Sequence, residues 1–184
     1  MKSFFKEALS TIKTSGTIKP SSKYLIDNCL KDINFKEAKT ILQFGSGEGC
    51  FTAELLSRMS EHTELFTYEI NSQFYTHCAN RFLPQDNLHL LNSSALEFEE
   101  VLNKECINKV DCIVSTLPLA LFKNTEVKNL LNKVYKYLNK NGVYIQYQYS
   151  LKSYRELKKT FDKVDLSFTL MNVPPAFVYT CYKK

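Results

Sequence analysis

The 184-residue chain has no tryptophan and only five glycines and five prolines. So little glycine and proline excludes a collagen-like chain, and 44% hydrophobic residues exclude a disordered one. No apolar run approaches the roughly 18 residues of a membrane-spanning helix, and the N-terminus is interrupted too early by Glu7 and Ser10 for a secretory signal. We therefore expect one soluble, cytoplasmic domain over residues 1–184, with peripheral contact at the inner face of the membrane as a further expectation.

The cysteines lack the spacing of a metal site or of a disulfide framework. None forms a C-x-x-C pair, and no Cys/His cluster has zinc spacing. Most lie among apolar neighbours, where a free cysteine behaves as a small hydrophobic residue. We expect no metal site and reduced, structural cysteines at Cys29, Cys50, Cys78, Cys106, Cys112 and Cys181.

The net charge of +5 is unevenly distributed. Residues 1–23 carry +4, residues 24–150 carry −3, and residues 151–184 carry +4. Basic ends around an acidic middle are typical of contact with an anionic partner, either lipid head groups or nucleic acid. A solvated surface with a chance asymmetry explains the same counts, so charge alone does not decide between them.

Hydrophobic periodicity predicts strands alternating with helices. The expected helices are residues 3–13, 22–30, 49–59, 72–82, 95–103, 125–138 (with a stop at Asn141-Gly142) and 152–161, and the expected strands are residues 39–44, 65–69, 88–91, 111–114, 143–149, 163–171 and 176–182. The last two strands, joined through Pro174-Pro175, suggest an antiparallel hairpin. The alternation predicts an α/β fold: a doubly wound, Rossmann-like, seven-stranded and mostly parallel sheet with a C-terminal antiparallel hairpin, plus N-terminal helices.

The most informative segment is a glycine-rich loop between a strand and a helix. Gly45, Gly47 and Gly49 let the backbone turn tightly and approach a ligand closely. Glu69 closes the next strand, where nucleotide-binding sheets place an acid that accepts hydrogen bonds from ribose. The G-x-G-x-G spacing favours a mononucleoside cofactor over NAD, and the absence of G-K-[ST] excludes a P-loop. A structural turn and a helix-capping carboxylate are the alternatives.

With this loop and acid the sequence resembles the class I S-adenosyl-L-methionine-dependent methyltransferases over nearly its whole length. The resemblance implies a cofactor-binding core over residues 39–184, preceded by a linker and helix at residues 15–38. It implies cofactor contacts from Gly45, Ser46, Gly47, Gly49, Glu69, Ile70, Ser94, Ala95 and Ser115. Ser94 stands where the family usually has Asp, and Gln43 where it often has an acid. These departures lower the expected cofactor affinity and keep a diverged cofactor-binding protein among the alternatives.

The segment Thr116-Leu117-Pro118-Leu119 follows the fourth core strand, which in this family borders the methyl-transfer site. The rRNA adenine dimethylases have Asn or Asp, a residue, Pro and an aromatic ring there, and this chain lacks both the amide and the ring. It looks closer to the bacterial phospholipid N-methyltransferases, which methylate phosphatidylethanolamine. The segments that carry this resemblance are residues 19–22, 115–119, 144–150 and 172–176.

The phospholipid resemblance implies a reaction centre formed by Leu117, Pro118 and Tyr147, with Ser21, Ser22 and Tyr149 contacting the substrate. The two tyrosines would hold a cationic methylated amine by cation–π attraction. A placement of one ring in the core and the other at the surface is the alternative. No His or carboxylate near these motifs is an obvious base, and the structural interpretation is preferred for His62, His77 and His89.

Residues 1–14 form an amphipathic pattern. Five apolar residues from Phe4 to Ile12 fall within roughly 140° of one helical face, with lysines at its edge. Such a helix can bind an anionic membrane surface or pack on its own domain. The leading interpretation is methyl transfer to an aminolipid, with nucleic acid an unlikely partner; rRNA adenine methylation and a diverged methyltransferase for an unknown small molecule are the alternatives. The oligomeric state is not predicted.

Overall fold

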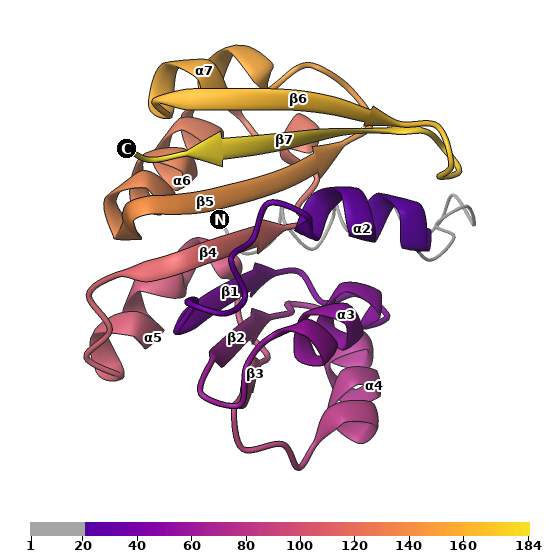
Figure 1. Ribbon diagram of the computed structural model, residues 1–184, viewed down its shortest axis with the longest axis vertical. Helices are drawn as coiled ribbons and strands as arrows, with labels where there is room; N and C mark the ends of the chain where they lie inside the picture. The colour runs from indigo at the N-terminus through magenta and orange to yellow at the C-terminus, as the bar shows by residue number, and fades with distance from the viewer. Residues whose placement is uncertain (1–20) are drawn as a thin grey trace.

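The computed structural model describes residues 21–184, which form one seven-stranded sheet between two layers of helices (Figure 1). The strand order is β3-β2-β1-β4-β5-β7-β6. The strands from β1 to β5 are parallel, and β7 runs antiparallel to both β5 and β6. The predicted mostly parallel sheet with an antiparallel C-terminal pair is confirmed. The amphipathic helix predicted for residues 1–14 lies outside the described residues, as do residues 15–20.

The element bounds follow the predicted order. The strands are β1 (Thr40–Phe44), β2 (Glu64–Tyr68), β3 (Leu88–Leu91), β4 (Val110–Ser115), β5 (Leu138–Gln148), β6 (Lys163–Thr169) and β7 (Ala176–Tyr182). The helices are α2 (Lys23–Leu30), α3 (Cys50–Arg58), α4 (Ser72–Phe82), α5 (Phe98–Lys104), α6 (Asn124–Tyr137) and α7 (Tyr154–Thr160), with short 3₁₀ turns η1 (Ala95–Glu97) and η2 (Leu119–Leu121). Within residues 21–184, no helix combines the length and the apolarity needed to cross a bilayer.

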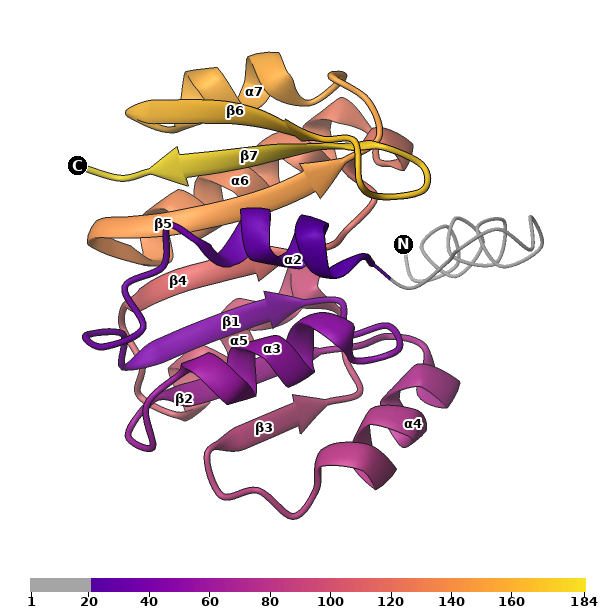
Figure 2. The same cartoon turned by 45° about the vertical axis from the view of Figure 1, so that its right-hand side comes forward.

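Side chains of each central strand alternate between two buried faces of the sheet. Leu42 and Phe44 of β1 pack with residues of α5, α6 and α7, whereas Ile41 packs with residues of α2 and α3. Figure 2 shows α2 and α3 in front of the sheet, with α5 and α6 behind it. Because both faces are covered, the central strands are nearly continuous apolar runs, as buried parallel strands usually are.

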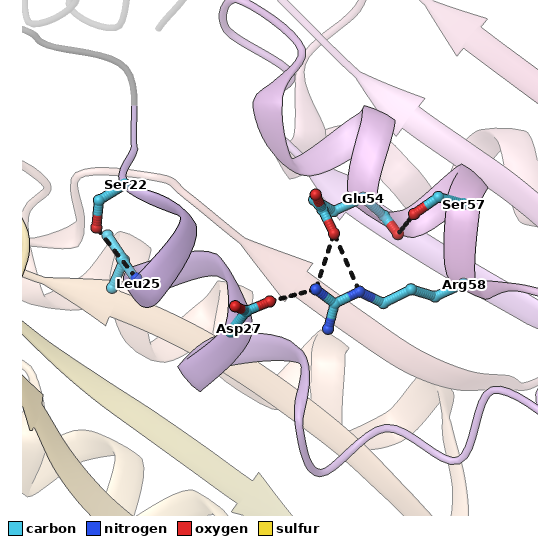
Figure 3. Close-up of polar contacts among 6 residues, drawn as sticks. All are labelled: Ser22, Leu25, Asp27, Glu54, Ser57 and Arg58. Carbon is cyan, nitrogen blue, oxygen red and sulfur yellow. Dashed lines mark hydrogen bonds and ion pairs between the residues drawn. The ribbon is translucent and has the colours of Figure 1, made fainter.

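Helix α2 is fixed at its start and along its outer side. The Ser22 hydroxyl accepts a hydrogen bond from the Leu25 N–H at 3.2 Å, which satisfies a donor in the first turn. Arg58 of α3 forms ion pairs with Asp27 of α2 and with Glu54 one turn earlier in its own helix (Figure 3). These pairs hold α2 against α3 on one face of the sheet.

Most boundaries agree with the sequence prediction within two residues, but β5 begins at Leu138 rather than residue 143, and β6 also ends early. The sixth expected helix ends at Tyr137, before Asn141-Gly142, and Leu138 already pairs with Val110 in the sheet. Asn141 instead takes a left-handed φ of 66° inside an irregularity of β5, where the register shifts. Strand β6 ends at Thr169 rather than residue 171, because pairing with β7 begins at Ala176, after two prolines that cannot donate to the ladder.

Candidate functional site

The glycine loop, residues 45–49, follows β1 at the carboxyl ends of the parallel strands. In the sheet β1 lies between β2 and β4. The strand order reverses at β1 and β4, and open α/β sheets bind ligands outside the strand ends at such a point. Gly45, Gly47 and Gly49 all have left-handed φ angles, of 85°, 52° and 83°. A Cβ at Gly45 would lie 2.6 Å from Thr116 Oγ1, whereas a Cβ at Gly47 would meet no atom within 4 Å. The loop is therefore tightly packed at Gly45 and has open space at Gly47.

Glu69 follows β2 and lies directly against this loop. Its carboxylate accepts the Gly47 N–H at 2.9 Å through Oε2 and the Asn71 N–H at 2.8 Å through Oε1. The Ser46 hydroxyl lies 3.5 Å from Oε2, and the Glu69 side chain is buried. The structure thus brings the glycine loop and the acid together, and Oε1, with one donor, keeps acceptor capacity for a further one.

Gln43, which stands where the family often has an acid, supports the loop from beneath. Its Nε2 donates to the Gly45 carbonyl at 3.2 Å. Its Oε1 accepts from the hydroxyls of Thr52 at 2.9 Å and Thr67 at 3.3 Å. The side chain is fully buried, so a neutral amide that both donates and accepts suits this position.

Replacing Gln43 by Glu should destabilise the protein, because a carboxylate cannot donate to the Gly45 carbonyl and would be buried without a cation. We expect a loss of about 1–3 kcal/mol in the free energy of unfolding. Urea denaturation of both forms measures it, with Gln85→Glu in the exposed turn before β3 as the matched control. Equal stability of Gln43→Glu and the wild-type protein would contradict this role.

The segment after β3 contributes a second group of polar atoms. The Ser94 hydroxyl accepts the Leu96 N–H at 3.2 Å and caps η1, and Ala95 is buried in the core. The Asn92 side chain donates to the Glu69 carbonyl at 2.8 Å, which joins this segment to the end of β2. The Ser93 Oγ is buried without a hydrogen-bond partner in the described structure. Sequence analysis did not single out Asn92 or Ser93, since neither belongs to a motif by itself.

The segment after β4 contacts the glycine loop from the other side. The Thr116 hydroxyl lies 3.1 Å from the Gly45 carbonyl, to which it donates. Ser115 is buried, and its Oγ accepts the Leu117 N–H at 3.4 Å. Leu117 is buried in the core and Pro118 is half-buried. Leu117 and Pro118, two of the three predicted reaction-centre residues, thus lie next to the glycine loop, because the preceding residue Thr116 is bonded to Gly45.

The Leu117 carbonyl is already fully engaged. It accepts hydrogen bonds from the Nε2 of Gln146 at 3.1 Å, from the Nε2 of Gln148 at 2.7 Å and from the Leu119 N–H at 2.8 Å. A carbonyl oxygen has two lone pairs, so three donors leave it no capacity for a substrate N–H. Gln146 in turn accepts from the buried Tyr144 hydroxyl at 2.7 Å. The sequence did not reveal this network, because its donors come from a different strand.

Tyr147 and Tyr149 lie together at the end of β5. Tyr147 stacks on Phe51 at 5.8 Å between ring centroids, and Tyr149 contacts its edge at 5.9 Å. Ser21 lies beside the Tyr147 hydroxyl. Tyr149 is half exposed. The structure therefore brings Ser21 and Tyr149, two of the three predicted substrate contacts, next to Tyr147 of the predicted reaction centre, while Ser22 serves as the helix cap.

Burial keeps one tyrosine and two thiols near the site in their neutral forms. Burial raises the pKa of Tyr147 above its ordinary value, so its phenol stays protonated at neutral pH. Burial likewise raises the pKa of the Cys50 and Cys78 thiols next to the glycine loop, and all six cysteines are free. His89 stacks on Phe66 at 4.3 Å and lies 2.6 Å from Glu64, which accounts for it structurally. Neither this tyrosine nor these thiols are therefore poised to act as a base.

These features fit a nucleoside cofactor. The open space at Gly47 admits a ligand close to the backbone. The Oε1 atom of Glu69 keeps acceptor capacity for a ribose hydroxyl, and the unpartnered Ser93 hydroxyl lies at the end of the next strand. Within residues 21–184, no cluster of His, Cys, Asp and Glu has the arrangement to hold a metal ion.

Comparisons with known proteins point to methyltransferases. The family model of ribosomal RNA adenine dimethylase matches residues 21–122. The ornithine lipid N-methyltransferase of Singulisphaera acidiphila is 24% identical over 179 residues, covering 97% of this chain and 91% of that protein. The rRNA adenine N-6-methyltransferase of Lysinibacillus sphaericus is 33% identical over 78 residues, covering 42% of this chain and 31% of that protein.

The same fold occurs in solved N-methyltransferase structures. The N-methyltransferase NodS from Bradyrhizobium japonicum WM9, in complex with S-adenosyl-L-homocysteine, aligns with a TM-score of 0.69 at 12% identity. The alignment covers 86% of this chain and 83% of that chain. At this identity the likeness concerns the fold.

Proposed function

We propose that this chain, which belongs to the ribosomal RNA adenine dimethylase family, transfers methyl groups to the amine of a membrane aminolipid. The chain is a class I S-adenosylmethionine-dependent methyltransferase, as its family and relatives show. The proposal concerns the acceptor. It places the cofactor over Gly45–Gly49 and Glu69, and the acceptor between the segment after β4 and the tyrosines at the end of β5.

The observation that carries the proposal is the saturated Leu117 carbonyl. A planar base amine needs acceptors at the segment after β4, and this chain supplies neither an amide at Thr116 nor a free carbonyl at Leu117. It also has Leu119 where an aromatic ring would stack on a base. The site therefore lacks the groups that grip a nucleobase. A flexible aliphatic amine has no such requirement.

The tyrosines suit an aliphatic amine that becomes a cation. An ammonium near aromatic ring faces is stabilised by their quadrupoles by about 0.5–2 kcal/mol, depending on desolvation. Tyr149 is exposed and Tyr147 half-buried, so together they provide an aromatic path from the surface toward β4. The ornithine lipid relative covers nearly the whole chain, which supports a lipid amine as the acceptor.

The chain's own contribution to the reaction is positioning and exclusion of water. When bound, S-adenosylmethionine supplies the methyl group on a sulfonium centre. The glycine loop and Glu69 fix its place, while Leu117 and Pro118 form an apolar wall that keeps the acceptor amine desolvated. Holding two reactants in the correct orientation supplies a large part of such a rate enhancement. In this proposal the amine loses its proton to solvent before it attacks.

The test is transfer of labelled methyl groups to two fractions side by side. We expect label in a total lipid extract and none in total RNA, with purified phosphatidylethanolamine and ornithine lipid then identifying the head group. A Glu69→Ala variant, which should bind the cofactor poorly, is the control for background labelling. Label in RNA alone would favour the second candidate, adenine methylation, for which the family match and the Lysinibacillus sphaericus relative speak.

A further inference from the structure

The exposed apolar side chains are concentrated at one edge of the sheet. Among the described residues, ten large hydrophobic side chains are exposed. Seven of them lie on segments at the carboxyl ends of the strands or at the start of α2: Tyr24, Leu121, Tyr149, Leu151, Leu170, Met171 and Val173. We call these seven residues the carboxyl-edge surface. Isolated exposed hydrophobic residues are normal, but such a concentration marks an interaction site.

The β6–β7 loop, residues 170–175, is the most apolar part of this surface. Leu170, Met171 and Val173 are 72%, 61% and 67% exposed, and the two prolines that follow are exposed as well. The one polar residue, Asn172, is buried. Loops in water are normally polar, so a loop that turns its polar residue inward and its apolar residues outward is shaped for an apolar environment.

Asn172 joins this loop to the start of α2. Its Oδ1 accepts the Ser22 N–H at 3.0 Å, and its Nδ2 donates to the Pro174 carbonyl at 2.7 Å. Tyr24, Leu170 and Met171 line the same open groove between α2 and β6. Figures 1 and 2 both show the loop beside the first turn of α2, on the side to which β5 points. The loop and the helix start therefore form one surface next to Tyr147 and Tyr149.

The charges on these segments have one sign. Residues 21–24, 119–123, 149–152 and 170–175 contain three lysines, Lys23, Lys123 and Lys152, and no acidic residue. The loops at the opposite edge of the sheet are mixed, with Asp32, Glu61 and Asp86 among them. Apolar side chains on segments whose only charged residues are lysines complement an anionic lipid surface.

We propose that the carboxyl-edge surface docks on an anionic phospholipid bilayer, with the β6–β7 loop inserted at the interface. The inference rests on the proposed aminolipid substrate and adds the surface through which that substrate is reached. Docking at this edge sets the tyrosines of β5 against the head groups, so an acceptor amine enters without leaving the bilayer. It involves only described residues and does not depend on residues 1–14.

The test is partition of the full chain onto vesicles that contain no primary amine. Vesicles of phosphatidylglycerol and phosphatidylcholine report docking in the absence of turnover, with phosphatidylcholine alone as the uncharged control. We expect Leu170→Ser/Met171→Ser to weaken partition by roughly tenfold or more, since it removes two of the three exposed apolar side chains of the loop. Leu166→Ser, an equally apolar change in the paired part of β6, should leave partition unchanged.

Cofactor affinity is measured on each variant to show that the fold is intact. Unchanged partition of the loop variant would overturn the docking surface, even if lipids are methylated. Loss of a dimer in light scattering, with unchanged partition, would identify the loop as a contact between two copies and also overturn it. Weakened partition together with label in RNA alone would support docking while removing the aminolipid substrate.

Discussion

Replacing Glu69 by Ala should weaken binding of S-adenosylmethionine and of S-adenosylhomocysteine by about 1–3 kcal/mol, a factor of roughly 5 to 150 in Kd. The carboxylate is buried and held by the Gly47 and Asn71 N–H groups, so its remaining lone pairs have a fixed direction. Its removal takes away an acceptor for ribose and also leaves the Gly47 N–H without its partner. Both effects reduce cofactor affinity.

Calorimetric titration with S-adenosylhomocysteine measures this loss. Glu64→Ala is the matched control, because Glu64 lies at the opposite end of β2 and contacts only His89 through its carboxylate in the described structure. Glu69→Gln, which keeps one acceptor oxygen, should lose less affinity than Glu69→Ala. If Glu69→Ala binds as tightly as the wild-type protein, the ribose lies elsewhere and the site assignment is wrong.

Gly45→Ala should mainly reduce the stability of the protein, whereas Gly47→Ala, in the same loop, should mainly reduce its affinity for the cofactor. Gly45→Ala places a methyl group 2.6 Å from Thr116 Oγ1 on a backbone with φ 85°, so we expect a loss of about 2 kcal/mol or more in the free energy of unfolding. Gly47→Ala meets no atom within 4 Å and should cost about 1 kcal/mol, from its left-handed backbone alone. Its methyl group, however, enters the space that we assign to the cofactor.

Denaturation and calorimetry on both variants separate the two effects. Gly47→Ala should lose more cofactor affinity than stability, and Gly45→Ala more stability. Combining Gly45→Ala with Thr116→Ala, which removes the opposing hydroxyl, should recover part of the lost stability. Full cofactor affinity in Gly47→Ala would show that the open space above this glycine is not the binding site.

The fold and the cofactor loop were predictable because their signals are local. The glycines, Glu69 and the apolar strands each follow from short stretches of sequence, and the structure confirms the seven-stranded sheet that they imply. The start of β5 was predicted at residue 143 and lies at Leu138, because Asn141-Gly142, a typical helix stop, serves instead in the irregular part of this strand. There, a Cβ at Gly142 would lie 2.9 Å from the Asn139 carbonyl.

The supporting contacts of the site were not predictable, because their partners come from distant segments. From the sequence, Gln43 indicated only a lower cofactor affinity, whereas in the structure its Oε1 accepts hydrogen bonds from the Thr52 and Thr67 hydroxyls. Likewise, the sequence around Leu117 does not indicate that Gln146 and Gln148 donate hydrogen bonds to its carbonyl oxygen. The assignments of individual residues to cofactor and acceptor stay predictions until the variants above are measured.

The attachment of α2 to the far end of the chain has a consequence for protein synthesis. Asn28 donates to the hydroxyls of Ser167 and Thr169, and the Thr180 hydroxyl donates to Asp32, so the first described helix packs on the last strands. These strands leave the ribosome after all the other described strands. During translation the apolar side of α2, with Leu25 and Leu30, has no completed surface to cover it until β6 and β7 have emerged. The nascent chain thus leaves part of this apolar face uncovered until β6 and β7 have emerged, which is the stage at which chaperone binding or aggregation competes with folding.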